Sequence, residues 1–274
     1  MNDIKVWYFR NNNAGDIFTA YLLRKLGYNP IWTDKDPELI CAGSILEASP
    51  LKLLESKQKN SVKIIGSGLH NKGSKPFTYN MNNFLAVRGK LTIESMTRLP
   101  RDTTVGDTGL LLSRIYKPKT DKKYKIGIIT HFVDYNHIKE TCPQEFKGSN
   151  IKIINMLLPD ETDSSFEKLF DEINECEFIF SSSLHGIIFA HSLGIPAYHI
   201  EDKPLLSRDN FKFKDYYSSI EIPYKKILYK NLFVNDNILN IIKQNNCVPK
   251  IELINSIQDG LLKCFDNFKR SQIK

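Results

Sequence analysis

Short apolar segments alternate with polar, glycine-containing turns along the first part of the chain. Apolar residues at helical spacing predict a helix over 17–26 that ends at Gly27, and a second helix is expected over 90–97. Apolar runs that end in glycine, serine or a charged residue predict strands at 4–9, 39–42, 62–65 and 84–87. Short strands of this kind between helices indicate a parallel sheet with crossover helices.

A basic segment, 117–124, interrupts this alternation within the run KPKTDKKYK and is typical of an exposed linker. Beyond it, strands are expected at 125–130, 151–155, 177–181 and 197–200, with helices at 165–175 and 185–193. The sequence therefore predicts an α/β protein of two Rossmann-like parallel-sheet domains that face a cleft. Residues 1–116 form the first domain and residues 125–274 the second.

Apolar residues three or four positions apart indicate one amphipathic helix near the C-terminus. They are Ile251, Ile254, Ile257, Leu261, Phe265 and Phe268. We expect this helix to pack on a domain and to cross back to the first one. The alternative is attachment to a membrane surface, which the adjacent Lys269 and Arg270 would favour.

Composition narrows the class of protein. Of 274 residues, 41% are hydrophobic and 25% are charged, values that are ordinary for a globular domain. No apolar run approaches the roughly 18 residues of a membrane span, and the first residues lack the layout of a signal peptide. The five scattered cysteines form no CxxC pair, which fits free thiols in a reducing compartment. We therefore expect a cytoplasmic protein.

The formal net charge of +7 favours acidic partners. Outside 117–125 the lysines are spread along the chain and no nucleic-acid-binding motif accompanies them, so no nucleic-acid partner is expected. The sequence contains no HExxH motif and no histidine pair with carboxylates at ligand spacing, and we expect no metal. It also contains neither a Walker A motif nor a GxGxxG fingerprint.

Polar and basic residues follow the predicted strands. In doubly wound sheets, ligands bind beyond the carboxyl ends of the strands, where helix N-termini present free N–H groups. The residues at these ends are Asp16, Gly43, Ser44, Arg88, His131, Ser181, Ser182, Ser183 and His185. A helix N-terminus, hydroxyls, an imidazole and an arginine together predict a site for a compact anion such as phosphate or carboxylate.

Each of these residues also has a structural interpretation. Asp16 can cap its helix, and one of the three serines is expected to cap the helix that starts at His185. Gly43 can serve only to permit a turn. His185 is either a structural histidine or a proton donor near neutral pH.

Eight motifs follow one another over the first 220 residues. They are NAGD at 13–16, CAGSIL at 41–46, IIGSGL at 64–69, AVRGKLT at 86–92, VGDTGLLL at 105–112, IGIITHFVD at 126–134, SSSLHGIIFAHSLGIP at 181–196 and FKFKDYYSS at 211–219. In this combination they resemble the polysaccharide pyruvyl transferase family, most closely its bacterial exopolysaccharide branch. The resemblance implies a two-domain fold like that of glycosyltransferase B enzymes and leaves the last fifth of the chain unassigned.

The resemblance also implies an activity: transfer of the enolpyruvyl group of phosphoenolpyruvate (PEP) to two hydroxyls of one sugar. The product is a pyruvate ketal in an exopolysaccharide or capsule. An acid must protonate the methylene carbon, cations must hold the phosphate and carboxylate, and a base must take the hydroxyl protons. PEP is the donor, no cofactor or metal is required, and the acceptor is a glycan or a lipid-linked oligosaccharide. The basic surface and the C-terminal helix would suit peripheral contact with the inner membrane face.

Carried over by position, the resemblance implies roles for individual residues. The catalytic candidates are His185, His131 and Asp16. The residues implied to bind PEP are Arg88, Ser181, Ser182, Ser183, His185 and Lys214, and those implied to face the acceptor are Asn13, Asp16, Gly43 and Ser44. Many relatives have arginine before LHG, where this chain has Ser183. The missing cation would come from Arg88 or His131, and in third place from Lys214.

Two other functions remain open. A nucleotide-sugar glycosyltransferase of similar fold would need an acidic residue on the ribose, which Glu201 or Asp202 could provide. A non-catalytic carbohydrate-binding relative is the other alternative, because the arginine before LHG is missing. Tyr216 and Tyr217 would either stack on a sugar ring or pack in the core.

Overall fold

The structure is a computed structural model that describes residues 2–78, 80–96, 98–143, 150–202, 209–234, 236–244 and 247–272. Its first half contains β1 (Asn2–Val6), α1 (Ala14–Lys25), β2 (Tyr28–Trp32), β3 (Leu39–Cys41), α2 (Ser49–Lys52), α3 (Ser56–Ser61), β4 (Lys63–Ser67), η1 (Met81–Asn83), β5 (Phe84–Val87), α4 (Lys90–Ser95), β6 (Thr104–Val105), η2 (Thr108–Leu111) and α5 (Leu112–Ile115). The strands form a six-stranded parallel sheet in the order β2-β1-β3-β4-β5-β6. The edge strand β2 was not predicted, since it contains Pro30, a residue that edge strands tolerate and central strands do not.

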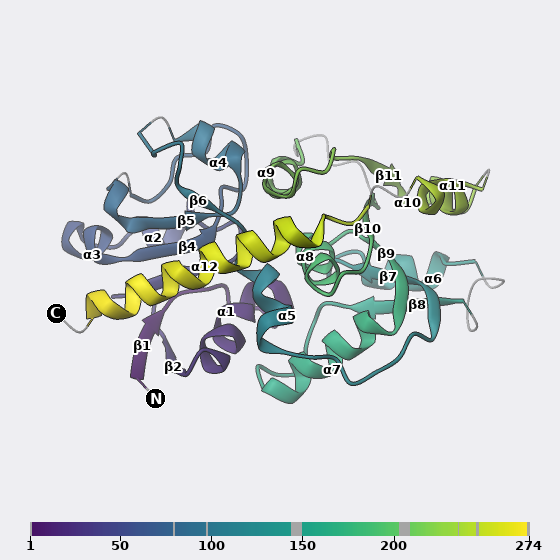
Figure 1. The fold of residues 1–274 in the computed structure, drawn as a ribbon, viewed down its shortest axis with the longest axis horizontal. Coiled ribbons are helices and arrows are strands. Elements are labelled where there is room, and N and C mark those ends of the chain that lie inside the picture. The colour runs from purple at the N-terminus through teal and green to yellow at the C-terminus, as the bar shows by residue number, and fades with distance from the viewer. Residues whose placement is uncertain are drawn as a thin grey trace.

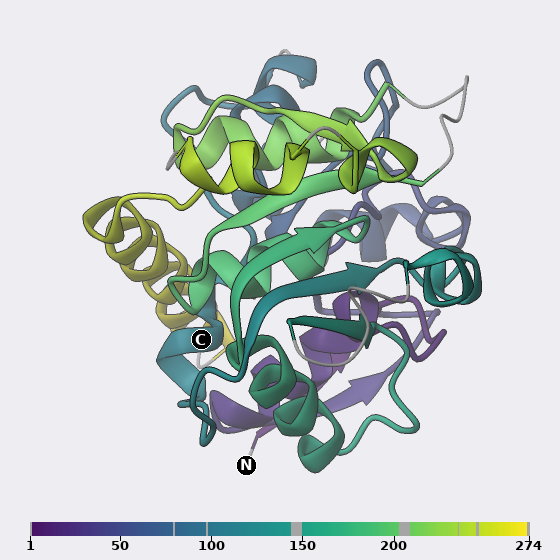
Figure 2. The same cartoon turned by 90° about the vertical axis from the view of Figure 1, so that its right-hand side faces the viewer.

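The second half forms its own sheet. It contains β7 (Tyr124–Thr130), α6 (Tyr135–Thr141), β8 (Ile151–Asn155), α7 (Asp163–Asn174), β9 (Cys176–Ser181), α8 (Leu184–Ser192), β10 (Ala197–Glu201), α9 (Phe211–Ile220), β11 (Lys226–Leu228), α10 (Tyr229–Leu232), α11 (Asn237–Lys243) and α12 (Ile251–Gln272). Five parallel strands take the order β11-β10-β9-β7-β8. The two sheets lie in two neighbouring units with helices around them (Figure 1, Figure 2). The predicted α/β class with two parallel-sheet domains is confirmed.

The two units share one apolar core, which fixes α1 against α7 and α8. The ring of Phe18 in α1 lies 5.0 Å from that of Phe189 in α8 and 6.2 Å from that of Phe170 in α7, centroid to centroid. Tyr21 packs 4.9 Å from Phe166. Aromatic contacts of this density bury large apolar area at the junction. These contacts therefore fix the position of the N-terminus of α1 relative to the N-terminus of α8.

The C-terminal helix α12 lies across the N-terminal sheet, beside β4, β5 and β6 (Figure 1). The Sγ of Cys264 is 3.2 Å from the carbonyl oxygen of Leu85, and Leu261 is fully buried. The apolar face of the helix is thus used in packing, with Ile251 as an exception that stays 57% exposed. Within the described ranges, no helix combines the length and the hydropathy needed to cross a bilayer.

The basic segment between the two sheets is exposed but held along α7. The Nζ of Lys119 lies 3.2 Å from Glu167, and that of Lys123 lies 2.6 Å from Glu175. Lys122 donates to the carbonyl oxygen of Cys176 at 2.8 Å. Two lysines of this segment, Lys119 and Lys123, therefore pair with carboxylates of α7 and of the residue that ends it.

Candidate functional site

Two adjoining cavities lie at the carboxyl ends of the strands. The interdomain cavity, of about 190 Å³, is lined by Phe9, Asn13, Asp16, Gly43, Ser44, Ile45, His70, His131, Ser183, Leu184, His185 and Lys212. The β10 cavity, of about 290 Å³, lies at the ends of β7, β9 and β10 and at the starts of α6 and α9. Three side chains line both: His70, His131 and Lys212. The four residues predicted to face the acceptor therefore lie in one cavity with His185.

The N-termini of α1 and α8 both border the interdomain cavity. Asn13 caps α1, because its side-chain oxygen accepts a hydrogen bond of 3.0 Å from the N–H of Gly15. Asp16 is therefore not the cap; it lies half-buried in the first turn and accepts a 2.8 Å bond from the Asn11 amide. A helix N-terminus carries unpaired N–H groups and a positive partial charge. Two of them at one cavity create a positively polarised site.

The three serines have different positions. Ser181 is fully buried, accepts from the N–H of Ser183 at 3.0 Å and donates to its carbonyl at 2.9 Å. Ser182 lines the β10 cavity, accepts from the N–H of His131 and donates to Asp134, both at 2.8 Å. Ser183 occupies the N-cap position of α8 without a capping bond from its hydroxyl and lines the interdomain cavity. A serine therefore occupies the N-cap position as predicted, but its hydroxyl does not bond the free N–H groups of the helix.

His185 lies in the first turn of α8 and is 7% exposed. Its Nε2 is 3.6 Å from Oδ1 of Asp107, the N-cap residue of η2. No hydrogen bond to this Nε2 is present within the described residues. On its other side the ring contacts Gly15, where a Cβ would come within 2.4 Å of the imidazole Nδ1. Only glycine leaves room for the ring at this position.

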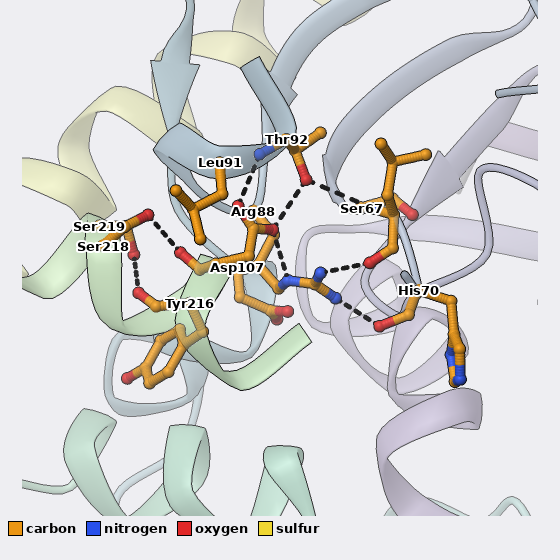
Figure 3. Close-up of polar contacts among 12 residues, drawn as sticks. Ser67, His70, Arg88, Leu91, Thr92, Asp107, Tyr216, Ser218 and Ser219 are labelled. Carbon is orange, nitrogen blue, oxygen red and sulfur yellow. Dashed lines mark hydrogen bonds and ion pairs between the residues drawn. The ribbon is translucent and has the colours of Figure 1, made fainter. Parts of the chain in front are cut away.

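Arg88 lines neither cavity. Its side chain is fully buried, with Nε 2.9 Å from Asp215 and Nη2 2.6 Å from the carbonyl oxygen of Leu69 (Figure 3). Asp215 also accepts from the N–H and the hydroxyl of Thr92, each at 2.8 Å. The guanidinium reaches Ser44 as well, and so supports the wall of the interdomain cavity from behind. Arg88, which was predicted to bind PEP, is therefore placed behind the cavity lining and not in it.

The structure separates two lysines of α9, of which Lys214 was predicted to bind PEP. Lys214 is exposed and lines neither cavity, whereas Lys212 lines both. Residues two positions apart on a helix lie on nearly opposite faces, at about 100° per residue. His70 and Asp107 were also missed. His70 follows the predicted GSG turn, and Asp107 belongs to the quoted VGDTGLLL motif, so both lay beside signals already visible.

Acidic groups mark the β10 cavity. The side chain of Asp202, 4% exposed, lies 2.7 Å from Nδ1 of His137. Glu201 pairs with Lys226 at 2.6 Å. Burial lowers the pKa of His199, another lining residue, to about 3, so its imidazole is neutral at physiological pH. Across the described ranges, His, Cys, Asp and Glu side chains form no group of three that could hold a metal ion.

A model of the family described as polysaccharide pyruvyl transferase matches residues 2–204. The chain belongs to this family. A similar sequence is an uncharacterised protein of Acanthamoeba polyphaga mimivirus, 31% identical over 255 residues, which are 85% of this chain and 82% of the viral one. A similar fold is found in the crystal structure of an uncharacterised Klebsiella pneumoniae protein, with a TM-score of 0.50 and 16% identity over 82% of this chain and 93% of that one.

Proposed function

We propose that the protein transfers the enolpyruvyl group of PEP to two hydroxyls of one sugar, which forms a pyruvate ketal on a cell-surface polysaccharide such as an exopolysaccharide or capsule. The observation that carries this proposal is the interdomain cavity, where two helix N-termini, His185 and Lys212 converge. A phosphate and a carboxylate on a three-carbon skeleton match that concentration of positive charge. Family membership supports the pyruvyl transfer itself.

The reaction can be written on the residues of this cavity. His185 delivers a proton to the methylene carbon of PEP, which leaves a cationic centre at C2. A sugar hydroxyl attacks C2 and gives its proton to a base, for which His131 and Asp16 are the candidates. The bond from C2 to the phosphate oxygen then breaks, and the second hydroxyl attacks C2 to close the ketal. The phosphate oxygen keeps the electron pair of the broken bond and takes up one hydroxyl proton, so inorganic phosphate leaves with the charge that the phosphate group had in PEP. The other hydroxyl proton replaces the one that His185 gave to the methylene carbon.

Lys212 supplies the positive charge that many relatives have as an arginine at the position of Ser183. Among the described residues it is the lysine that lines the interdomain cavity, and it lies in the first turn of α9. An ammonium in this position can pair with a phosphate or carboxylate oxygen. His70 and His131 stand beside it at the boundary with the β10 cavity.

Phosphate release from PEP tests the proposal. Wild-type protein with a glycan acceptor should release phosphate, and His185→Gln and His185→Ala should both lower the rate by about 100-fold or more, the scale of a lost general acid. The thermal midpoint of each variant shows whether it folds. Full turnover by folded His185→Gln would contradict the proposed role.

The glycosyltransferase alternative is tested by thermal shift. Glu201 and Asp202, which would hold a ribose, do line the β10 cavity. Stabilisation by UDP- or GDP-sugars with no response to PEP would favour that alternative over the pyruvyl transfer. We expect the reverse.

A further inference from the structure

The geometry points to the β10 cavity as the binding site for the acceptor sugar, a neutral hexose unit of the glycan. This inference rests on the proposed function, since it places the second substrate of the same reaction. It moves the acceptor away from Asn13, Asp16, Gly43 and Ser44, which lie in the interdomain cavity beside His185. The two substrates would then occupy neighbouring cavities.

The charges of the β10 cavity differ from those of its neighbour. Four carboxylates line it, from Asp134, Glu201, Asp202 and Asp209. Lys212 and the imidazole of His137 line the same cavity, so the carboxylates are partly compensated. Sugar hydroxyls donate to carboxylates and accept from imidazoles and amides. The cavity therefore suits a neutral ligand that carries many hydroxyls.

Contacts within the protein already orient these carboxylates. Asp202 is held by His137 at 2.7 Å, and Asp134 accepts from the hydroxyl of Ser182 at 2.8 Å. A carboxylate has about four lone-pair sites, so the contact of Asp202 with His137 leaves acceptor capacity for a ligand hydroxyl. Carboxylates fixed by a neighbour lose less entropy when a sugar binds.

The lining of the cavity also includes aromatic side chains. Phe211 and Phe213 line it together with His199, whose neutral ring stacks on Phe213 with centroids 3.7 Å apart and an interplanar angle of 18°. These rings are 2–5% exposed, so they contribute apolar contacts at the cavity lining and no open stacking face. A lining that combines apolar groups with carboxylates and imidazoles suits a pyranose, which carries both C–H and O–H groups.

The boundary between the two cavities explains how the substrates would meet. His131 lines both, and its loop is fixed because its N–H donates to Ser182 and its carbonyl accepts from Asp134 at 2.9 Å. A sugar in the β10 cavity can extend two hydroxyls past this imidazole toward C2 of PEP. His131 is thereby placed to accept a hydroxyl proton, consistent with its predicted catalytic role.

Saturation-transfer NMR with methyl glycosides of galactose, glucose and mannose tests this assignment. We expect at least one glycoside to bind wild-type protein, and Asp202→Asn or His137→Ala to weaken its binding by about tenfold or more, the scale of a lost hydrogen bond to a charged group. Glu140→Gln is the control, because Glu140 is exposed on α6 and lines neither cavity. His137 is exposed, so its replacement should not disturb folding.

Thermal shift with PEP is measured on the same variants and separates the two proposals. PEP stabilisation should be unchanged in Asp202→Asn and His137→Ala. If the glycosides bind these variants as they bind wild type, or bind none of the proteins, the β10 cavity is not the acceptor site while the PEP result stands. If PEP does not stabilise the wild-type protein, that result would instead contradict the proposed function. Glycoside binding would then stand as an independent result.

Discussion

Nε2 of His185 lies 3.6 Å from Oδ1 of Asp107, a contact that joins the C-terminal unit to the N-terminal unit. The same Oδ1 accepts a 2.8 Å bond from the N–H of Gly109. Asp107 is fully buried, and its Oδ2 makes no hydrogen bond within the described part of the chain. A buried carboxylate oxygen without a donor is costly. Because this carboxylate lies beside His185, we expect Asp107 to position the imidazole.

Asp107→Asn should separate the capping of η2 by this side chain from the effect of its negative charge on His185. The amide oxygen can still accept from Gly109, because asparagine caps as well as aspartate does, so the thermal midpoint should change little. The negative charge beside His185 is lost, and we expect kcat to fall by about tenfold or more with little change in KM for PEP. Steady-state phosphate release measures both constants. An unchanged kcat would show that Asp107 serves η2 alone.

Lys212 and Lys214 form a matched pair on α9. Lys212→Met should weaken PEP binding by about tenfold or more, the scale of a lost charge-assisted contact, while Lys214→Met should leave it near wild type. Isothermal titration with PEP measures both dissociation constants. Equal effects of the two substitutions would indicate only a general loss of positive charge.

The buried pair of Arg88 and Asp215 should be a stability element. Asp215→Asn leaves the guanidinium of Arg88 without its counter-ion in a fully buried position, and we expect the free energy of unfolding to fall by about 3 kcal/mol. The control is Asp259→Asn, which removes an exposed partner of Arg114 and should cost less than about 1 kcal/mol. Urea unfolding measures both. Similar losses for the two variants would show that the buried pair has no special weight.

Two buried histidines should make stability depend on pH. Burial lowers the pKa of His191 to about 4 and that of His199 to about 3, against 6.5 in an unfolded chain. Because each pKa is lower in the folded protein, the stability is fully present above pH 6.5 and is lost as the pH falls through the window below it. Each histidine should lower the free energy of unfolding by up to about 1.4 kcal/mol per pH unit between pH 6 and 5.

Urea unfolding at several pH values checks this dependence. In His199→Gln the slope should be about half of the wild-type slope, since the amide can still bond Tyr224 but does not titrate. Carboxylates titrate mainly below this range, so they contribute little to it. A free energy of unfolding that is constant from pH 6.5 to 5 would contradict the assignment of two neutral buried imidazoles.

Much of the fold could be predicted from the sequence, because the spacing of apolar residues shows which side of a helix or strand is buried. The other strands lie at or within a few residues of the apolar runs that predicted them, whereas the edge strands β2, β6 and β11 were not predicted. The site followed less fully. Sequence indicates that Asn13 and Asp16 stand at a strand end, but which of them caps α1 depends on backbone geometry.

Arg88 shows the other limit of sequence reasoning. From sequence, a basic residue at a strand end looks the same whether it faces a ligand or forms an ion pair with an acidic residue far along the chain. Here the guanidinium of Arg88 is buried in an ion pair with Asp215 of α9, which lies 127 positions away in the sequence. Long-range partners of this kind are set by how the two units pack, and no local pattern encodes them.

The most direct test is a crystal of the protein soaked with PEP. The account predicts density for the phosphate and carboxylate in the interdomain cavity, between the N-termini of α1 and α8, with Lys212 and His185 in contact. Density for PEP in the β10 cavity alone, or an empty interdomain cavity at saturating PEP, would contradict it.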